Sequence, residues 1–309
     1  MRPGDRELAT RLEKRLLAHD QNVRPLPGIR ESATRRAFLE QVVESIRRIR
    51  FVQTIRVRPP SAGRLDPNDH LFDPLKAAIL HQRSGEIEEA FWLIFLFVHF
   101  GKNARGGWRL AREVYGRLGE GGCWNWVRVS SDTAGFRAWL HAHQAALKRG
   151  GVAGGFGNHR KFQSLDAYSR DGTGATVETY VEWVHPPRTH QALVEEAYER
   201  ADGDRRRAFH SLYQSLNTVA GFGRLARFDY LTMIGKLGLA HIEPGSTYMQ
   251  GASGPLKGAR LLYGLDAGAG VLDAWLLELD TEFDVGMQVL EDALCNWQKS
   301  PSEFIPFRG

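Results

Sequence analysis

The chain has 309 residues, of which 42% are hydrophobic and 25% are charged, and these values are ordinary for a globular domain and exclude a disordered chain. A formal net charge of +5 permits a polyanionic partner, although an excess of this size also occurs in proteins that never touch nucleic acid. Two distant cysteines exclude a disulfide framework and give no reason to expect a zinc site, which favours a reducing compartment. The charged start lacks the apolar stretch of a signal peptide, and no apolar run has the length of a membrane span. We therefore expect a cytoplasmic protein that does not contact a membrane.

The spacing of apolar residues predicts a mostly α-helical fold. Residues 1–30 are expected to form a peripheral segment, and residues 31–309 a single helical domain. The segment 86–100 is acidic at its start and apolar on nearly every side, which predicts the central core helix. A stretch rich in proline, glycine and aspartate over residues 59–74 is the candidate hinge. The other predicted helices up to residue 219 cover residues 32–52, 75–82, 108–118, 132–149, 177–184, 190–201 and 204–219.

In the C-terminal third, helices are predicted over residues 223–237, 255–263, 271–279 and 283–297. Between the first two lies a turn-rich connection, residues 238–254. A helix, a glycine-bearing connection and a second helix with free N-terminal amides can hold a DNA phosphate by dipole and hydrogen bonds. Alternation with a period of two is almost absent, which argues against all-β and parallel α/β folds.

The first candidate site is the sequence GFGNHRK at residues 155–161, which ends in Asn158, His159, Arg160 and Lys161. Its two glycines let the backbone approach a ligand, and three cationic or protonatable side chains suit a phosphate or pyrophosphate. His159 is the natural proton carrier, and Arg160 has the geometry to grip two phosphate oxygens. The alternative is a glycine loop followed by a solvated helix start.

The second candidate is the last long helix, where Asp292, Cys295 and Lys299 follow one another at three- and four-residue spacing. One helix face would then carry a carboxylate, a thiol and an amine. The carboxylate could accept a proton from an incoming nucleophile, and the amine could stabilise a leaving anion. The alternative is a surface set with a buried, structural cysteine.

Two further candidates concern DNA backbone contacts. Gly254, Lys257 and Gly258 suit a phosphate at a helix start, although a plain helix entry with proline in its first turn explains the same residues. Arg224 and Arg227 lie three apart on one predicted helix face and could straddle a phosphate, or they form an ordinary charged face. The sequence has no Walker A, G-x-S-x-G or H-E-x-x-H motif and gives no reason to expect a metal or cofactor.

Four segments together resemble the alpha-glutamyl/putrescinyl thymine pyrophosphorylase family, within it the third clade. They are FLFVHFGK at 95–102, WRLAREVYG at 108–116, GFGNHRKFQS at 155–164 and EDALCNWQK at 291–299. The resemblance covers about residues 35–300. It implies a helix-hairpin-helix DNA-glycosylase-like fold that carries out transfer chemistry on a modified pyrimidine.

In the scheme that the resemblance implies, a separate base kinase pyrophosphorylates a hydroxymethyluracil in DNA, and an enzyme of this family then replaces the pyrophosphate with an amine or amino acid. The carry-over assigns His159, Arg160 and Lys161 to the pyrophosphate, Asp292 to deprotonation of the amine and Lys299 to charge stabilisation. Cys295 would line the site or be structural.

Three other interpretations stay open. A DNA glycosylase would excise the base, but the lysine and distal aspartate of glycosylases are not recognisable after Gly254, which favours transfer. A non-catalytic module could read modified bases through a retained pocket, although clustered ionisable residues argue mildly against it. A helical scaffold that binds protein would make the positive charge incidental.

Overall fold

The computed structural model describes residues 3–58, 60–148, 155–160 and 162–306, and within these residues it contains fourteen α-helices and no β-strand. The predicted mostly α-helical class is therefore confirmed. The chain divides into two compact units. Unit 1 comprises Met1–Val52 and Pro244–Arg308, and unit 2 comprises Gln53–Glu243. The two chain ends belong to the same unit.

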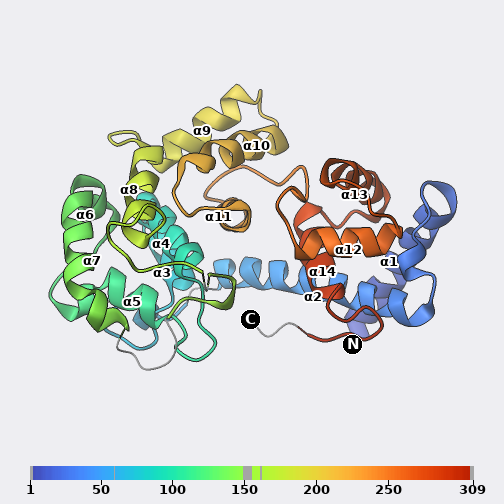
Figure 1. Ribbon diagram of the computed structural model, residues 1–309, viewed down its shortest axis with the longest axis horizontal. Coiled ribbons are helices and arrows are strands. Elements are labelled where there is room, and N and C mark those ends of the chain that lie inside the picture. Colours follow the sequence, from blue (N-terminus) through green and yellow to red (C-terminus); the bar gives the residue numbers. More distant parts are fainter. Residues whose placement is uncertain (1–2, 59, 149–154, 161, 307–309) are drawn as a thin grey trace. The chain divides into compact units, whose positions relative to one another are not determined.

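Unit 1 is built from helices of both ends of the chain, shown at the blue and red ends of the colour scale in Figure 1. Helix α2 continues past Val52 into the first residues of unit 2. Helix α12 packs along α14, and α1 packs on α13. The helices of unit 1 are α1 (Pro3–Asn22), α2 (Ser32–Val57), α12 (Gly254–Tyr263), α13 (Ala269–Phe283) and α14 (Met287–Trp297), with the 3-10 helix η1 (Pro27–Ile29) between the first two.

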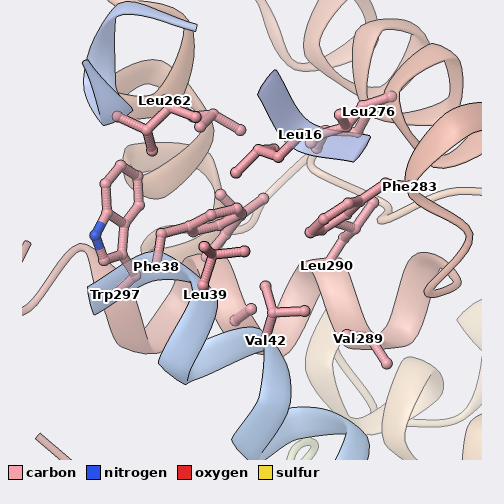
Figure 2. Close-up of a cluster of buried hydrophobic side chains, with 14 of the residues drawn as sticks. Leu16, Phe38, Leu39, Val42, Leu262, Leu276, Phe283, Val289, Leu290 and Trp297 are labelled. Carbon is pink, nitrogen blue, oxygen red and sulfur yellow. The ribbon is translucent and has the colours of Figure 1, made fainter. Parts of the chain in front are cut away.

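The core of unit 1 brings together apolar residues more than 200 positions apart in the sequence (Figure 2). Phe38 of α2 stacks on Phe283 of α13 and meets Trp297 of α14 edge to face, with ring centroids 6.4 and 5.1 Å apart. Leu12 and Leu16 of α1 are buried in the same core. One face of α1 thus contributes to this core.

Unit 2 contains the remaining helices. Helix α4 is its core element, because eleven of its fourteen residues are buried, as the apolar pattern predicted. Helices α3, α5, α9 and α11 pack on it, and α3 and α4 lie side by side in Figure 1. The helices are α3 (Pro74–Arg83), α4 (Ile87–Phe100), α5 (Arg109–Tyr115), α6 (Trp126–Ser131), α7 (Thr133–Lys148), α8 (Thr173–Val184), α9 (His190–Arg200), α10 (Arg205–Ser215) and α11 (Arg224–Leu237). Four 3-10 turns accompany them in the described residues: η2 (Ala62–Arg64), η3 (Arg117–Gly119), η4 (Asn158–Arg160) and η5 (Leu216–Thr218).

Local sequence explains where several of these helices begin and end. The Asp73 side chain accepts a hydrogen bond from the Lys76 amide, and Pro74 occupies the first turn of α3. Helix α11 ends at Gly238, whose φ of 70° is the left-handed conformation that glycine adopts without strain. Helix α5 stops before residue 118, the predicted end, because Leu118 has a φ of 54°.

No helix in the described residues has both the length and the apolar character needed to cross a membrane. Cys123 and Cys295 are both free thiols. The described residues contain no group of three or more histidine, cysteine, aspartate or glutamate side chains arranged to hold a metal ion.

Candidate functional site

The segment Gly155–Ser164, which carries the first predicted cluster, lies against the C-terminal end of α4. The Gly157 amide donates to the carbonyl of Phe100 at 2.8 Å, and the Asn103 side chain donates to the carbonyl of Phe156 at 2.9 Å. A Cβ on Gly157 would come within 2.9 Å of backbone atoms of Gly101 and Lys102. Glycine at 157 is therefore needed for the backbone of this segment to touch the end of α4, rather than to admit a ligand.

Arg160 fixes this segment from inside, since its side chain is only 7% exposed. Its Nε donates to the carbonyl of Val98 at 2.7 Å, and Nη1 donates to the carbonyl of His159 at 3.3 Å. Nη2 donates to the Asp229 carboxylate of α11 at 2.7 Å. The guanidinium thus joins the end of α4, the predicted cluster and α11, and all three of its nitrogens are engaged.

A second link reaches the connection between α10 and α11. The Gln163 side chain donates to the carbonyl of Gly221 at 2.9 Å, and its backbone amide donates to the carbonyl of Arg160 at 2.9 Å. Gly221 has a φ of 67°, and a Cβ there would come within 3.1 Å of the Thr176 hydroxyl. The first predicted cluster and the predicted arginine helix are therefore neighbours within unit 2.

Helices α10 and α11 pack on each other and are joined by a short connection, residues 216–223. Gly223 is the N-cap of α11, and no side chain caps the first amides of the helix there. A Cβ on Gly223 would meet nothing within 4 Å, so the start of α11 has open space beside it. This start of α11 combines a positive dipole end with accessible backbone donors.

The two predicted arginines of α11 differ in their surroundings. Arg224, in the first turn, is half-buried and lies 5.0 Å from the ring centroid of Phe228. Arg227 lies 4.4 Å from the ring centroid of Tyr213 on α10 and donates to its carbonyl at 3.3 Å. Arg227 therefore ties α11 to α10, whereas Arg224 lies closer to the open start of the helix.

His159 is exposed, and Phe162 is 91% exposed, although both follow or flank the buried Arg160. Lys161 and the side chain of Asn158 lie outside the described part of the chain, and their predicted roles stay predictions. The segment thus directs one cation inward, at Arg160, and presents an imidazole and an aromatic ring outward.

His99 supports the same segment from the interior, with 1% exposure. Its Nε2 lies 3.0 Å from the Thr173 hydroxyl, which donates to the carbonyl of Ser164 at 2.8 Å. The threonine proton is used in that bond, so His99 donates through Nε2 and carries its lone pair on Nδ1. Nδ1 is buried without a hydrogen-bond partner among the described residues. Burial, followed by the charge of Arg160, lowers the pKa of His99 from 6.5 to about 3.

The second predicted cluster lies in unit 1, where a row of polar contacts runs along α14. Asp292 pairs with Arg48 of α2 at 2.5 Å, and its other oxygen accepts from the Asn296 amide at 3.0 Å. Lys299, just past the end of α14, donates through Nζ to the Asn296 oxygen at 3.0 Å. The predicted carboxylate and amine are thus connected through Asn296, a residue that the sequence did not single out.

Cys295 and the predicted glycines of α12 take part in helix packing. A Cβ on Gly254 would lie 2.8 Å from the Cys295 Sγ, and one on Gly258 would lie 2.4 Å from the carbonyl oxygen of Leu294. The spacing of these glycines lets α12 lie directly on α14. Lys257, between them, is exposed. The connection predicted as a DNA-binding hairpin over residues 238–254 joins α11 of unit 2 to α12 of unit 1, and α12 begins at Gly254.

The candidate residues therefore fall into two groups. His159, Arg160, Arg224 and Arg227 belong to unit 2, where the contacts through Asp229 and Gln163 bring them together. Gly254, Lys257, Gly258, Asp292, Cys295 and Lys299 belong to unit 1.

Comparison with known proteins indicates the function to which these candidate residues could contribute. A family described as alpha-glutamyl/putrescinyl thymine pyrophosphorylase clade 3 matches residues 33–309, nearly the whole chain. The chain belongs to this family. The resemblance noted from four sequence segments is thereby confirmed, and the name of the clade 3 family implies an enzyme that acts on modified thymine in DNA. No curated protein and no solved structure gives a significant match.

Sequence reasoning missed two contacts that hold the unit 2 site together and one exposed aromatic residue beside it. The contacts of Asp229 and Gln163 were not predicted, because their partners are 69 and 58 residues away in the chain. Phe162 directly follows the predicted cluster, but its exposure has no sequence signature, since phenylalanine is usually buried. The glycines at 221 and 223 were the one local signal available for the α10–α11 connection.

Proposed function

We propose that this protein replaces the pyrophosphate of a pyrophosphorylated 5-hydroxymethyluracil in DNA with an amine or amino acid. Family membership over residues 33–309 carries the proposal, because it implies an enzyme of thymine hypermodification. The meeting of the 155–164 segment with the start of α11 supports it, because this is a place where DNA backbone, a protonatable group and an aromatic ring could come together. Proposed partners are DNA with a modified pyrimidine, the amine donor and a separate base kinase.

The reaction is a substitution at the exocyclic methylene of the base. The lone pair of the amine nitrogen forms a bond to the methylene carbon, and the carbon–oxygen bond to pyrophosphate breaks with its electrons going to the pyrophosphate oxygen. The nitrogen then loses a proton to a base. Rate acceleration therefore requires cations near the departing pyrophosphate, a proton acceptor near the amine and a pocket for an unstacked base.

The contacts refine the roles of the unit 2 residues. His159 is exposed and keeps its proposed role at the pyrophosphate, together with Lys161 and Asn158. Arg160 is a positioning residue in this proposal, because its guanidinium is buried and donates hydrogen bonds to the carbonyls of Val98 and His159 and to the carboxylate of Asp229. It would hold the segment in place for its neighbours rather than grip phosphate itself.

In unit 1, Asp292 remains the proposed proton acceptor and Lys299 the proposed stabiliser of developing negative charge. Oδ2 of Asp292 accepts two hydrogen bonds from Arg48, whereas Oδ1 accepts one from the Asn296 side chain and has a second lone pair that an amine N–H could use. Cys295 would be structural, because its thiol packs at the start of α12. Lys257 lies between Gly254 and Gly258 and is exposed, and it stays a proposed contact to the DNA backbone.

We also propose that the DNA-glycosylase-like helix-hairpin-helix consists of α10, residues 216–223 and α11. Support comes from the packing of the two helices, the left-handed Gly221 and the uncapped start of α11 at Gly223. Arg224 then lies in the first turn of the second helix, where a phosphate contact is expected.

The test is intact-mass analysis of a duplex with one pyrophosphorylated hydroxymethyluracil, incubated with the protein and a pool of amines and amino acids. A mass change equal to loss of pyrophosphate and gain of an amine supports the transferase. An abasic, alkali-labile product would instead identify a glycosylase, and unchanged DNA that binds in a salt-sensitive way would identify a reader. Either result overturns the proposal.

Variants assign the roles. His159→Ala should lower the transfer rate by roughly 100-fold, the lower range for a lost acid–base or charge contact. His70→Ala removes a histidine whose side chain is 84% exposed elsewhere in unit 2, and it should leave the rate unchanged. Asp292→Asn keeps the shape of the side chain but removes the proton acceptor, so transfer should fall while DNA affinity is retained.

A further inference from the structure

Phe162 is 91% exposed, more than any other large apolar side chain in the described residues. Leaving a phenylalanine in water forgoes roughly 1.5–3 kcal/mol that its burial would contribute. Single exposed apolar residues are common, so exposure alone has no functional meaning. What distinguishes Phe162 is its place in the sequence between residues that are held in unit 2.

Two residues close to Phe162 in the sequence, Arg160 and Gln163, make side-chain hydrogen bonds within unit 2. Arg160 is tied to Val98 and Asp229, and Gln163 is tied to Gly221, each by side-chain hydrogen bonds of 2.7–2.9 Å. One residue further on, the carbonyl of Ser164 accepts from the Thr173 amide at 2.8 Å. The ring is therefore close in sequence to residues that are held in place, which limits the entropy lost when it binds a partner.

The residues next to Phe162 in the sequence and those at the start of α11 favour a polyanion with flat apolar groups. The sequence has no aspartate or glutamate over residues 155–164 or over residues 216–227. The nearest acidic side chain on α11, Asp229, is paired with Arg160. The start of α11, where no N-cap side chain bonds the first amides and where Arg224 lies, adjoins the connection that Gln163 contacts. One nucleotide strand could then place a phosphate at the start of α11 and a base on the ring of Phe162.

We propose that Phe162 stacks on a nucleobase of the DNA substrate that has lost a stacking neighbour. This inference rests on the proposed function for its DNA substrate. An aromatic ring can take the place of a neighbouring base, because every base has a π face, whatever its sequence. The ring would hold the strand open beside the modified thymine, while the start of α11 holds its phosphate.

The experiment measures DNA affinity by fluorescence anisotropy for a duplex with one unpaired thymine, over a series of salt concentrations. Phe162→Ala should weaken binding roughly 5- to 150-fold, the range of 1–3 kcal/mol for stacking on one base. Phe162→Trp should bind at least as tightly as the wild type. Val127→Ala, which trims a residue that is 75% exposed on α6, is the matched control and should bind like the wild type.

The salt dependence separates stacking from a phosphate contact. Because Phe162 carries no charge, Phe162→Ala should shift affinity equally at every salt concentration and leave the logarithmic slope unchanged. A slope reduced by about one would mean that the substitution disturbs a phosphate contact, and it would overturn the inference. Unchanged DNA affinity combined with loss of self-association would identify a protein-binding surface, and it would overturn the inference too.

Failure of the inference and failure of the proposed function give different results. If the wild type binds the duplex with the unpaired thymine but does not replace pyrophosphate in the pyrophosphorylated duplex, the transferase proposal fails. The comparison of Phe162→Ala with the wild type then still decides whether Phe162 stacks on a base. If transfer occurs and Phe162→Ala neither weakens binding nor slows transfer, only the stacking inference fails.

Discussion

Protonation of His99 should destabilise unit 2 under mildly acidic conditions. In the folded protein its Nδ1 is buried without a partner among the described residues, so a proton there would add a buried charge and a donor with no acceptor. In the unfolded chain the same imidazole is solvated and takes up a proton near pH 6.5. The unfolded state therefore binds more protons than the folded state below this pH, and stability falls as the pH falls.

The size of the effect follows from the pKa of about 3 in the folded state, lowered by burial and by the charge of Arg160. Between pH 7.5 and pH 5 the folded imidazole stays neutral while the unfolded one becomes protonated. Each pH unit below about 6.5 costs about 1.4 kcal/mol, so between pH 7.5 and pH 5 the free energy of unfolding should drop by about 2 kcal/mol from this one group. The loss should continue down to about pH 3 and then level off.

The assay is urea unfolding at pH 7.5 and pH 5, followed by tryptophan fluorescence. Six of the eight tryptophans lie in unit 2, so this signal reports mainly on the unit that contains His99. His99→Gln removes the titrating group and keeps a donor for Thr173. Other titrating groups contribute equally to both proteins. The free energy of unfolding of the wild type should therefore fall by about 2 kcal/mol more than that of the variant between pH 7.5 and pH 5. Equal losses, or a His99 ring that titrates near pH 6.5 by NMR in the folded protein, would refute this reasoning.

Three further predictions concern stability. Gly258→Ala should destabilise unit 1 by about 2–4 kcal/mol, because its Cβ would overlap a backbone carbonyl of α14, whereas Gly270→Ala, with nothing within 4 Å, should be neutral in the same thermal unfolding assay. Glu88→Gln should cost about 1–3 kcal/mol, since its carboxylate accepts hydrogen bonds from both the amide and the ring of His190; a melting temperature within 1 °C of wild type would contradict it. Asp229→Asn should cost about 1–2 kcal/mol in urea unfolding, less than a fully buried pair, because this carboxylate is 42% exposed; no measurable loss would show that the ion pair contributes nothing.

Much of the secondary structure could be predicted from local sequence. The apolar run that became α4 and the residue pattern of α14 specify helices without reference to the rest of the chain. The short helix α6 was missed, because its six residues are too few for a periodic signal. The joining of the two chain ends in one unit has no local signal either, because it depends on contacts between residues more than 200 positions apart.

The candidate site was predictable in its composition but not in its contacts. The glycine and cationic residues at 155–161 could be singled out, but the inward direction of Arg160 depends on a carboxylate on α11 that only folding brings near. Likewise, Gly254 and Gly258 have the same spacing whether they face a phosphate or another helix. The packing interpretation is favoured because a Cβ on Gly254 would overlap the thiol of Cys295. Sequence thus indicates which residues are special before it indicates what they touch.

The discontinuity of unit 1 has a consequence for how the chain is made. Helices α1 and α2 are synthesised first, but the apolar partners of Leu16 and Phe38 on α13 and α14 follow only after about 190 residues of unit 2 and the helices themselves. At the usual 5–20 residues per second, these apolar faces stay without their partners for about 10–50 s on the ribosome. Unit 2 can complete its own core in that interval, while the N-terminal helices present a binding surface for chaperones.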